Sequence, residues 1–84
     1  MINVYTHPKH ERTCALTLEK LNARHIEHRI ISRANKPHID QWLTNHGHLK
    51  SPVVEVTGAT NRRWSGYRPD LIDALAIEQA HHEQ

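Results

Sequence analysis

The only cysteine of the chain lies close to two histidines near the N-terminus. The segment reads His7-Pro8-Lys9-His10-Glu11-Arg12-Thr13-Cys14. An ionised thiol attacks disulfides, an imidazole beside a carboxylate exchanges protons, and imidazoles together with a thiolate bind zinc or copper. The sequence therefore raises three chemistries for one loop, and the elements that position Cys14 decide between them.

The metal and acid–base interpretations have little support in the residue pattern. His7, His10 and Cys14 would supply three ligands with no evident fourth, whereas structural zinc sites use four. His10 and Glu11 could form an acid–base pair, but the sequence contains no recognisable substrate pocket or oxyanion donors. We therefore expect no metal and no cofactor, and we interpret these side chains as solvated polar residues of a loop.

The composition limits the class of protein. With 84 residues, 11 Lys plus Arg, 9 Asp plus Glu and a net charge of +2, the chain is one small domain, too evenly charged to wrap a polyanion. We interpret Arg62-Arg63-Trp64 as a strand with outward arginines, not as a nucleic-acid surface. A single cysteine excludes an internal disulfide and a cysteine-rich zinc module, and it is typical of a reduced, cytoplasmic protein. No apolar stretch approaches the roughly 20 residues of a membrane span.

Histidine is unusually frequent, with 9 copies spread along the chain. Because imidazole titrates near neutral pH, the net charge rises well above +2 in mild acid. The scatter favours a pH-sensitive surface over a single metal cage. The histidines are His7, His10, His25, His28, His38, His46, His48, His81 and His82.

The first part of the chain predicts a strand, a helix and a second strand parallel to the first. Residues 2–6 and 26–31 are rich in β-branched side chains, as strands are. Between them, apolar residues from Cys14 to Leu21 recur at helical spacing and form one stripe. Thr13 is the expected N-cap of this helix, and a start one turn earlier is the alternative.

The middle of the chain predicts a second helix and an antiparallel hairpin. Pro37 suits the first turn of a helix, and Gly47 suits the position just after its end. Trp42 recurs with the apolar residues of this helix, so we expect it to be buried. Residues 52–57 and 62–64 have strand composition and complete the predicted sheet.

The last part of the chain predicts a turn and a third helix. Residues 58–61 have turn chemistry, and Pro69 opens a helix with an acidic residue in its first turn. We expect the tail after Ala76 to fray. The order β-α-β-α-β-β-α predicts an α/β fold with a four-stranded mixed sheet flanked by helices, in one domain over residues 1–84 with its core in about 2–76.

Three segments resemble NrdH redoxins, which are glutaredoxin-like proteins of the thioredoxin superfamily. The run Arg63-Trp64-Ser65-Gly66-Tyr67-Arg68-Pro69-Asp70-Leu71-Ile72 is similar to their W-S-G-F/Y-R-P-D signature. Ser51-Pro52-Val53-Val54 resembles their cis-proline segment, and Val4-Tyr5-Thr6 resembles the strand that leads into their active site. The resemblance extends from residue 2 to about residue 76 and implies a minimal thioredoxin fold.

The resemblance also implies where partners bind. Family members carry a C-x-x-C motif at the start of the first helix, receive electrons from thioredoxin reductase and pass them to class Ib ribonucleotide reductase. The loop after the fourth strand and the cis-proline segment border that site, and a cis peptide bond would expose main-chain groups to an extended partner peptide. The residues carried over as partner-binding are Ser51, Pro52, Trp64, Ser65, Gly66, Tyr67 and Arg68.

The active-site loop departs from the family pattern. Alignment on the downstream helix places Cys14 at the second cysteine and Glu11 at the attacking one, and this requires one extra loop residue. Without the insertion, His10 and Thr13 occupy the two cysteine positions. In both registers the attacking cysteine is missing, so residues His10, Glu11, Arg12 and Thr13 form an active-site loop without a dithiol.

Cys14 itself has two interpretations. Capped by Thr13 in a first helical turn, and with basic side chains nearby, it would be an exposed thiolate of lowered pKa. Sharing an apolar stripe with Leu21, it would instead be a small buried core residue, which is the interpretation we favour. A third register reads Cys14-Ala15-Leu16-Thr17 as a monothiol C-x-x-T motif, but it fits the downstream helix less well.

Three functions follow from these alternatives. The first is a redoxin that keeps the docking surface without the dithiol and acts as a partner-binding or regulatory protein. The second is a monothiol redox protein in which Cys14 is catalytic and works with an external thiol. The third is a metal-binding or scaffold role for the histidine-rich loop. The expected partners are a thioredoxin reductase, a ribonucleotide reductase component or another disulfide protein. The expected state is a monomer, with a Cys14-linked dimer as the alternative.

Overall fold

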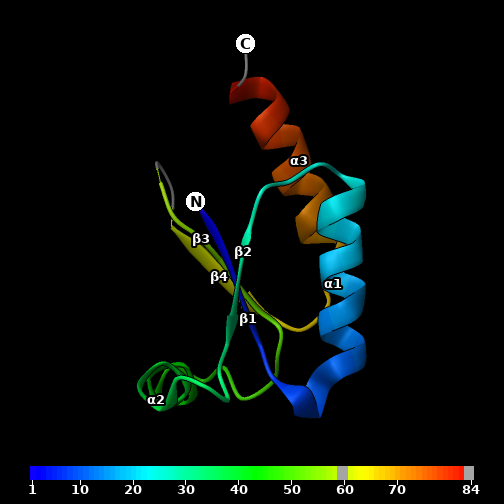
Figure 1. The fold of residues 1–84 in the computed structure, drawn as a ribbon. Helices are drawn as coiled ribbons and strands as arrows, with labels where there is room; N and C mark the ends of the chain where they lie inside the picture. Colours follow the sequence, from blue (N-terminus) through cyan, green and yellow to red (C-terminus); the bar gives the residue numbers. More distant parts are fainter. Residues whose placement is uncertain (59–60, 83–84) are drawn as a thin grey trace.

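The computed structural model describes residues 1–58 and 61–82, with side chains through Gln79. The elements follow the predicted order along the chain (Figure 1). They are β1 (Ile2–Thr6), the 3-10 turn η1 (Pro8–His10), α1 (Glu11–Ala23), β2 (Arg29–Ser32), α2 (Pro37–Asn45), β3 (Val53–Val56), β4 (Arg62–Ser65) and α3 (Pro69–His82).

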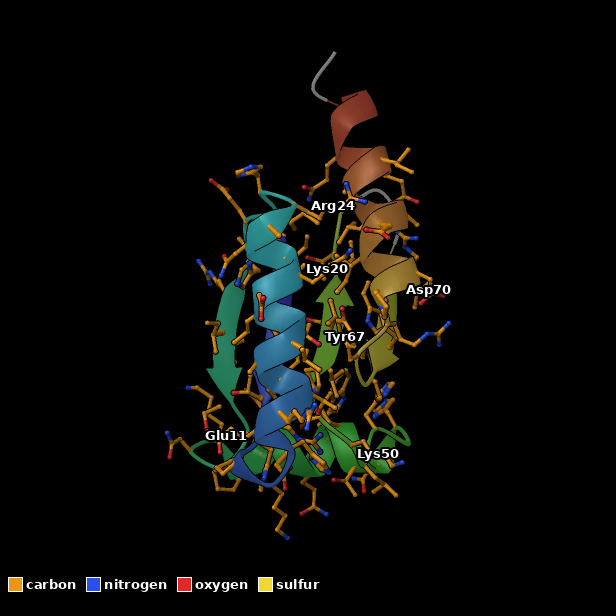
Figure 2. The ribbon with its side chains drawn as sticks, turned by 90° about the vertical axis from the view of Figure 1, so that its right-hand side faces the viewer. Glu11, Lys20, Arg24, Lys50, Tyr67 and Asp70 are labelled. Carbon is orange, nitrogen blue, oxygen red and sulfur yellow. The ribbon has the colours of Figure 1, made fainter. Side chains whose placement is uncertain are left out.

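The four strands form one mixed sheet in the order β2-β1-β3-β4. β1 and β2 are parallel, with Val4 beside Ile30, whereas β3 pairs antiparallel with both β1 and β4. Helices α1 and α3 lie side by side over one face of the sheet (Figures 1 and 2), where Lys20 and Arg24 of α1 both contact Asp73 of α3. Helix α2 lies on the other face, toward one end. The predicted α/β fold class and the minimal thioredoxin topology are confirmed.

The core divides into two clusters, one on each face of the sheet. Helices α1 and α3 cover one face, and α2 covers part of the other. Alternate strand residues point toward α1 and α3, as the strand period of two requires. The larger cluster consists of Ile2, Val4, Leu21, Ile26, Val54, Trp64, Ile72 and Leu75. The smaller cluster, beneath α2, consists of Tyr5, Leu43 and Val53.

Helix α1 ends in a Schellman motif, which explains why β2 begins later than predicted. The Ile26 N–H donates to the Leu21 carbonyl at 3.0 Å and the His25 N–H donates to the Asn22 carbonyl at 3.1 Å. His25 takes the left-handed position of the motif, with φ of 58°. Ile26 is therefore a buried contact that closes the helix, not the first residue of a strand, and its apolar character led to the wrong boundary.

Helix α3 extends past Ala76 to His82, so the first six residues of the predicted tail are helical. An ion pair between Arg62 of β4 and Glu78 of α3 ties this part of the helix to the sheet. The predicted turn at residues 58–61 includes positions 59–60, which lie outside the described residues. None of the described helices is long and apolar enough to cross a membrane.

Candidate functional site

The loop after β1 is largely helical. η1 is stabilised by His7, whose Nδ1 accepts a hydrogen bond from the Lys9 N–H at 3.1 Å. α1 then starts at Glu11, so the alternative start one turn before Cys14 is confirmed and Thr13 is not the N-cap. Of the predicted loop residues, Glu11 and Arg12 are exposed, and Glu11 lies at the same end of the molecule as Lys50 (Figure 2).

Cys14 lies in the first turns of α1 but faces inward. Its side chain is 5% exposed. Burial raises the pKa of the Cys14 thiol above its ordinary value, and a hydrogen bond from the His7 main chain acts in the opposite direction without reversing the shift. At neutral pH Cys14 is therefore a protonated, shielded thiol, which agrees with the buried interpretation.

The segment before β3 meets this loop. The Ser51–Pro52 peptide bond is cis, as the resemblance implied, and Ser51 is 1% exposed. The Ser51 N–H donates to His10 Nδ1 at 3.2 Å. The Ser51 carbonyl accepts from the Thr13 hydroxyl at 3.0 Å, and the same hydroxyl lies 3.1 Å from the His10 carbonyl. The expectation that this segment exposes its main chain was therefore wrong for Ser51, because side chains of the preceding loop occupy both of its main-chain groups.

Arg33 is a site residue that the sequence did not reveal. Its guanidinium is 3% exposed and donates to Asp40 Oδ1 at 2.8 Å, to Ser51 Oγ at 3.1 Å and to Thr44 Oγ1 at 3.4 Å. Its main-chain N–H also bonds the Thr6 carbonyl at 2.9 Å. Arg33 thus joins α2, the end of β1 and Ser51, and no local pattern around it marks a buried arginine.

The loop after β4 borders the site as the resemblance implied. The Gly66 N–H donates to the Pro52 carbonyl at 2.7 Å. The Ser65 hydroxyl lies 2.7 Å from His48 Nδ1. The other residues carried over from the family point elsewhere: Trp64 lies in the large core cluster, Tyr67 packs against that cluster, and Arg68 pairs with Asp70.

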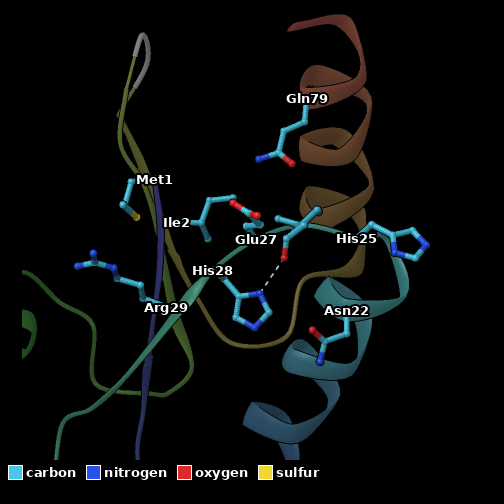
Figure 3. A pocket seen from close by; sticks show the side chains of 9 residues that line it. Met1, Ile2, Asn22, His25, Glu27, His28, Arg29 and Gln79 are labelled. Carbon is cyan, nitrogen blue, oxygen red and sulfur yellow. Dashed lines mark hydrogen bonds between the residues drawn. The ribbon is translucent and has the colours of Figure 1, made fainter. Parts of the chain in front are cut away.

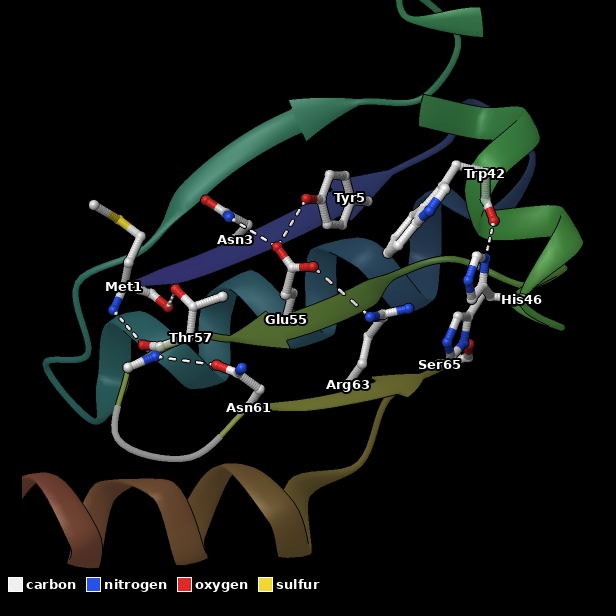
Figure 4. A network of polar contacts seen from close by, with 12 residues as sticks. Met1, Asn3, Tyr5, Trp42, His46, Glu55, Thr57, Asn61, Arg63 and Ser65 are labelled. Carbon is white, nitrogen blue, oxygen red and sulfur yellow. Dashed lines mark hydrogen bonds and ion pairs between the residues drawn. The ribbon is translucent and has the colours of Figure 1, made fainter. Parts of the chain in front are cut away.

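The open part of the sheet carries a polar network next to α2 (Figure 4). Glu55 accepts from Tyr5 at 3.0 Å and from Asn3 at 3.1 Å, and it also pairs with Arg63. The Arg63 guanidinium lies 4.4 Å from the ring centre of Trp42. Trp42 is 41% exposed, so the expectation of a buried tryptophan was wrong, because α2 covers only one end of this face.

Two further features concern ligands. Among the described residues, no three His, Cys, Asp or Glu side chains are grouped closely enough to hold a metal ion. An open pocket of about 910 Å³ lies at the other end of α1 from Cys14 (Figure 3). Its lining includes Asn22, His28 and Gln79, none of which belongs to the site.

The fold and this site were compared with known proteins. No protein-family model matches the chain, and no curated protein matches it. Among solved structures, the glutaredoxin-like protein NrdH-redoxin from Escherichia coli, described as having a thioredoxin-like activity profile, is 30% identical, with a TM-score of 0.76. The match covers 88% of this chain and 92% of that one. The thioredoxin-like protein BC3987 is 18% identical, with a TM-score of 0.73. That match covers 89% of this chain and 99% of the other, and it is a similarity of fold.

The structural match agrees with the sequence signature. The cis-proline segment, the loop after β4 and the start of α1 meet at one end of the sheet, as the resemblance implied. The match to NrdH-redoxin is not confined to this site, because it covers nearly the whole of both chains. The chain belongs to the NrdH-redoxin family of glutaredoxin-like proteins within the thioredoxin superfamily.

Proposed function

We propose that this protein is a redoxin that docks on a protein partner without running a dithiol cycle, and so acts as a partner-binding or regulatory member of its family. The observation that supports this most directly is the state of Cys14. It is the only sulfur nucleophile in the chain, it is 5% exposed, and burial raises its pKa. A shielded thiol is a poor attacking group.

The chemistry of disulfide reduction supports the same conclusion. One thiolate attacks the disulfide and a second releases the mixed disulfide, so two sulfurs complete a turnover. In the register that aligns Cys14 with the family's second cysteine, Glu11 takes the attacking position, and without the inserted residue His10 takes it. Neither a carboxylate nor an imidazole can form a mixed disulfide. The contacts between segments that the resemblance assigns to docking support the proposal: His10 and Thr13 bond Ser51, and Gly66 bonds Pro52.

The chemical class of partner follows from family membership. We propose a cytoplasmic protein that normally meets NrdH redoxins, such as a thioredoxin reductase or a ribonucleotide reductase component, or another disulfide protein. The surface offered to it consists of the active-site loop and the residues around Pro52 and Gly66.

A monothiol function for Cys14 is the second candidate. Cys14 lies near the N-terminus of α1, where the helix dipole favours a thiolate, and the His7 main chain also lowers its pKa. An external thiol such as glutathione would then resolve the mixed disulfide. Burial outweighs both effects, which is why we place this function second.

Insulin reduction with thioredoxin reductase and NADPH tests the proposal. We expect no turnover above a Cys14→Ser control, and alkylation of native Cys14 that is much slower than alkylation of the unfolded chain. Turnover comparable to that of an ordinary redoxin would overturn the proposed function. Rapid native alkylation, with turnover that appears only when glutathione is added, would establish the monothiol alternative in its place.

A further inference from the structure

Two histidines of the active-site loop serve as hydrogen-bond acceptors. His10 Nδ1 lies 3.2 Å from the Ser51 main-chain nitrogen, and His7 Nδ1 lies 3.1 Å from the Lys9 main-chain nitrogen. A main-chain N–H can only donate, so each Nδ1 must carry a free lone pair. In this arrangement the ring proton of each histidine lies on Nε2.

Histidines elsewhere in the described chain bond differently. His28 Nδ1 lies 2.8 Å from the Ile26 carbonyl, and His46 Nδ1 lies 2.7 Å from the Trp42 carbonyl. A carbonyl can only accept, so these nitrogens carry protons, and a second proton on the ring leaves their bonds intact. A proton on Nδ1 would therefore remove the acceptors of His7 and His10, whereas the bonds of these two other histidines would persist.

The bond from Ser51 to His10 occupies a main-chain donor beside Pro52. The Thr13 hydroxyl bonds the Ser51 carbonyl and His10 bonds the Ser51 N–H, so an extended partner strand finds neither group free. Such a strand needs main-chain donors and acceptors to pair with. Displacement of His10 would free the Ser51 N–H, which is the donor such a strand requires.

We propose that His10 acts as a proton-dependent switch, called the latch, on the Ser51 main chain. The neutral imidazole of His10 accepts a hydrogen bond from the Ser51 N–H, and the protonated imidazole releases it. His7 lies beside His10 and contributes to the release. The ring centres of His7 and His10 are 6.4 Å apart, so two positive charges would also repel each other. The latch rests on the proposed function in that Ser51 belongs to the docking surface. It adds that docking is favoured by mild acid.

Several titratable or charged side chains belong to the segments that meet at His10 and Ser51. Cationic side chains oppose protonation and anionic ones favour it, but neither changes the fact that a protonated Nδ1 has no lone pair. Four elements contribute: the loop and α1, the segment after β2, the segment before β3 and the loop after β4. Their titratable or charged side chains are Lys9, Glu11, Arg12, Cys14, Arg33, His48, Lys50 and Tyr67.

Amide hydrogen exchange measured by NMR tests the latch without a partner. Each observed rate is divided by the intrinsic rate at the same pH, at about pH 8 and about pH 5. We expect protection of the Ser51 amide to fall about tenfold in acid, as loss of one hydrogen bond allows. The Arg33 amide, which bonds the Thr6 carbonyl, reports whether the fold persists and should keep its protection.

Two substitutions of the same residue make the test specific. In His10→Asn, the amide oxygen takes the place of Nδ1 and cannot gain a proton at these pH values, so Ser51 should stay protected in both conditions. In His10→Ala, Ser51 should be unprotected in both. His38→Ala, which changes an exposed histidine on α2, should behave like the unmodified chain.

The outcomes separate the latch from the proposed function. Equal Ser51 protection at the two pH values, or the same acid response in His10→Asn as in the unmodified chain, overturns the latch and leaves the proposed function standing. Insulin turnover by the unmodified chain overturns the proposed function and has no bearing on the Ser51 amide.

Discussion

At the scale of single residues, the site differs from a dithiol redoxin in what lies at the start of α1. Glu11 is exposed in the first turn, and Cys14 follows three positions later and is buried. The scaffold around them retains the cis Ser51–Pro52 bond and the contact from Gly66 to Pro52. The proposed function attributes the lack of a dithiol cycle to a single missing sulfur in otherwise similar surroundings.

Glu11→Cys tests this explanation by restoring the missing sulfur. The variant reads Cys-Arg-Thr-Cys from position 11 to Cys14, and its new thiol is exposed at the positive end of the helix dipole, which lowers a thiol pKa. We expect insulin reduction that is absent from the unmodified chain. Glu19→Cys, an exposed position farther along α1, is the control. No gain by Glu11→Cys, in a folded protein, would mean that more than the attacking sulfur has been lost.

His48 provides a prediction about pH and stability. Burial, and then the positive charge of Arg63 and the neighbouring His46 and Arg33, lower the pKa of His48 below its ordinary 6.5. Below pH 6.5 the unfolded chain binds this proton and the folded chain does not, so the stability contributed by neutral His48 is complete above pH 6.5 and is lost as the pH falls toward the folded value.

Urea unfolding at about pH 7.5 and about pH 5.5 measures this effect. We expect His48→Gln to lose less stability on acidification than the unmodified chain, because the group with the lowered pKa is gone. His38→Gln, at an exposed position, should retain the full loss. Identical acid losses in all three proteins would show that His48 does not couple folding to pH.

At the scale of elements, the ends of the helices are set by local geometry that composition does not reveal. α1 starts three residues before Cys14, after a 3-10 turn capped by His7, and ends in the Schellman motif of His25 and Ile26. α2 is attached to the site through Arg33 and Asp40. The elements themselves were predicted because hydrophobic spacing marks their middles, whereas their ends depend on single hydrogen bonds.

His25→Gly tests the helix end. A non-glycine residue in the left-handed region is strained by roughly 1–2 kcal/mol, while glycine adds about 0.5–1 kcal/mol of chain entropy cost. We expect the free energy of unfolding to rise by up to about 1 kcal/mol. His25→Ala keeps the Cβ atom and should give no such gain. A decrease for His25→Gly would show that the imidazole itself stabilises the helix end.

At the scale of the whole molecule, one face of the sheet carries most of the core. Leu21 is completely buried in the larger cluster, between the sheet and the α1–α3 pair. Small domains have stabilities of about 5–15 kcal/mol, so one large cavity removes a substantial part of the total. The opposite face is only partly covered by α2, which leaves Trp42 exposed and Glu55 and Arg63 in a polar network.

Leu21→Ala tests this division of the core. We expect the free energy of unfolding to fall by about 2–5 kcal/mol, because the side chain is replaced by a cavity. Leu49→Ala, at a side chain that is 68% exposed, should change it by less than about 0.5 kcal/mol. Chemical denaturation of both variants provides the measurement, and a small effect of Leu21→Ala would place the main core elsewhere.

The sequence by itself determined the order of the elements, the family signature around Trp64 and the presence of a single cysteine. These depend on hydrophobic periodicity and on runs of adjacent residues, which are local properties of the chain. The tertiary structure alone decided that Cys14 is buried, that Arg33 is enclosed beside Ser51 and that His10 and Thr13 close the Ser51 main chain. Those two closing bonds join residues 41 and 38 positions apart, and Arg33 lies 18 positions from Ser51. Burial and hydrogen bonding between such distant segments arise only when the sheet brings them together.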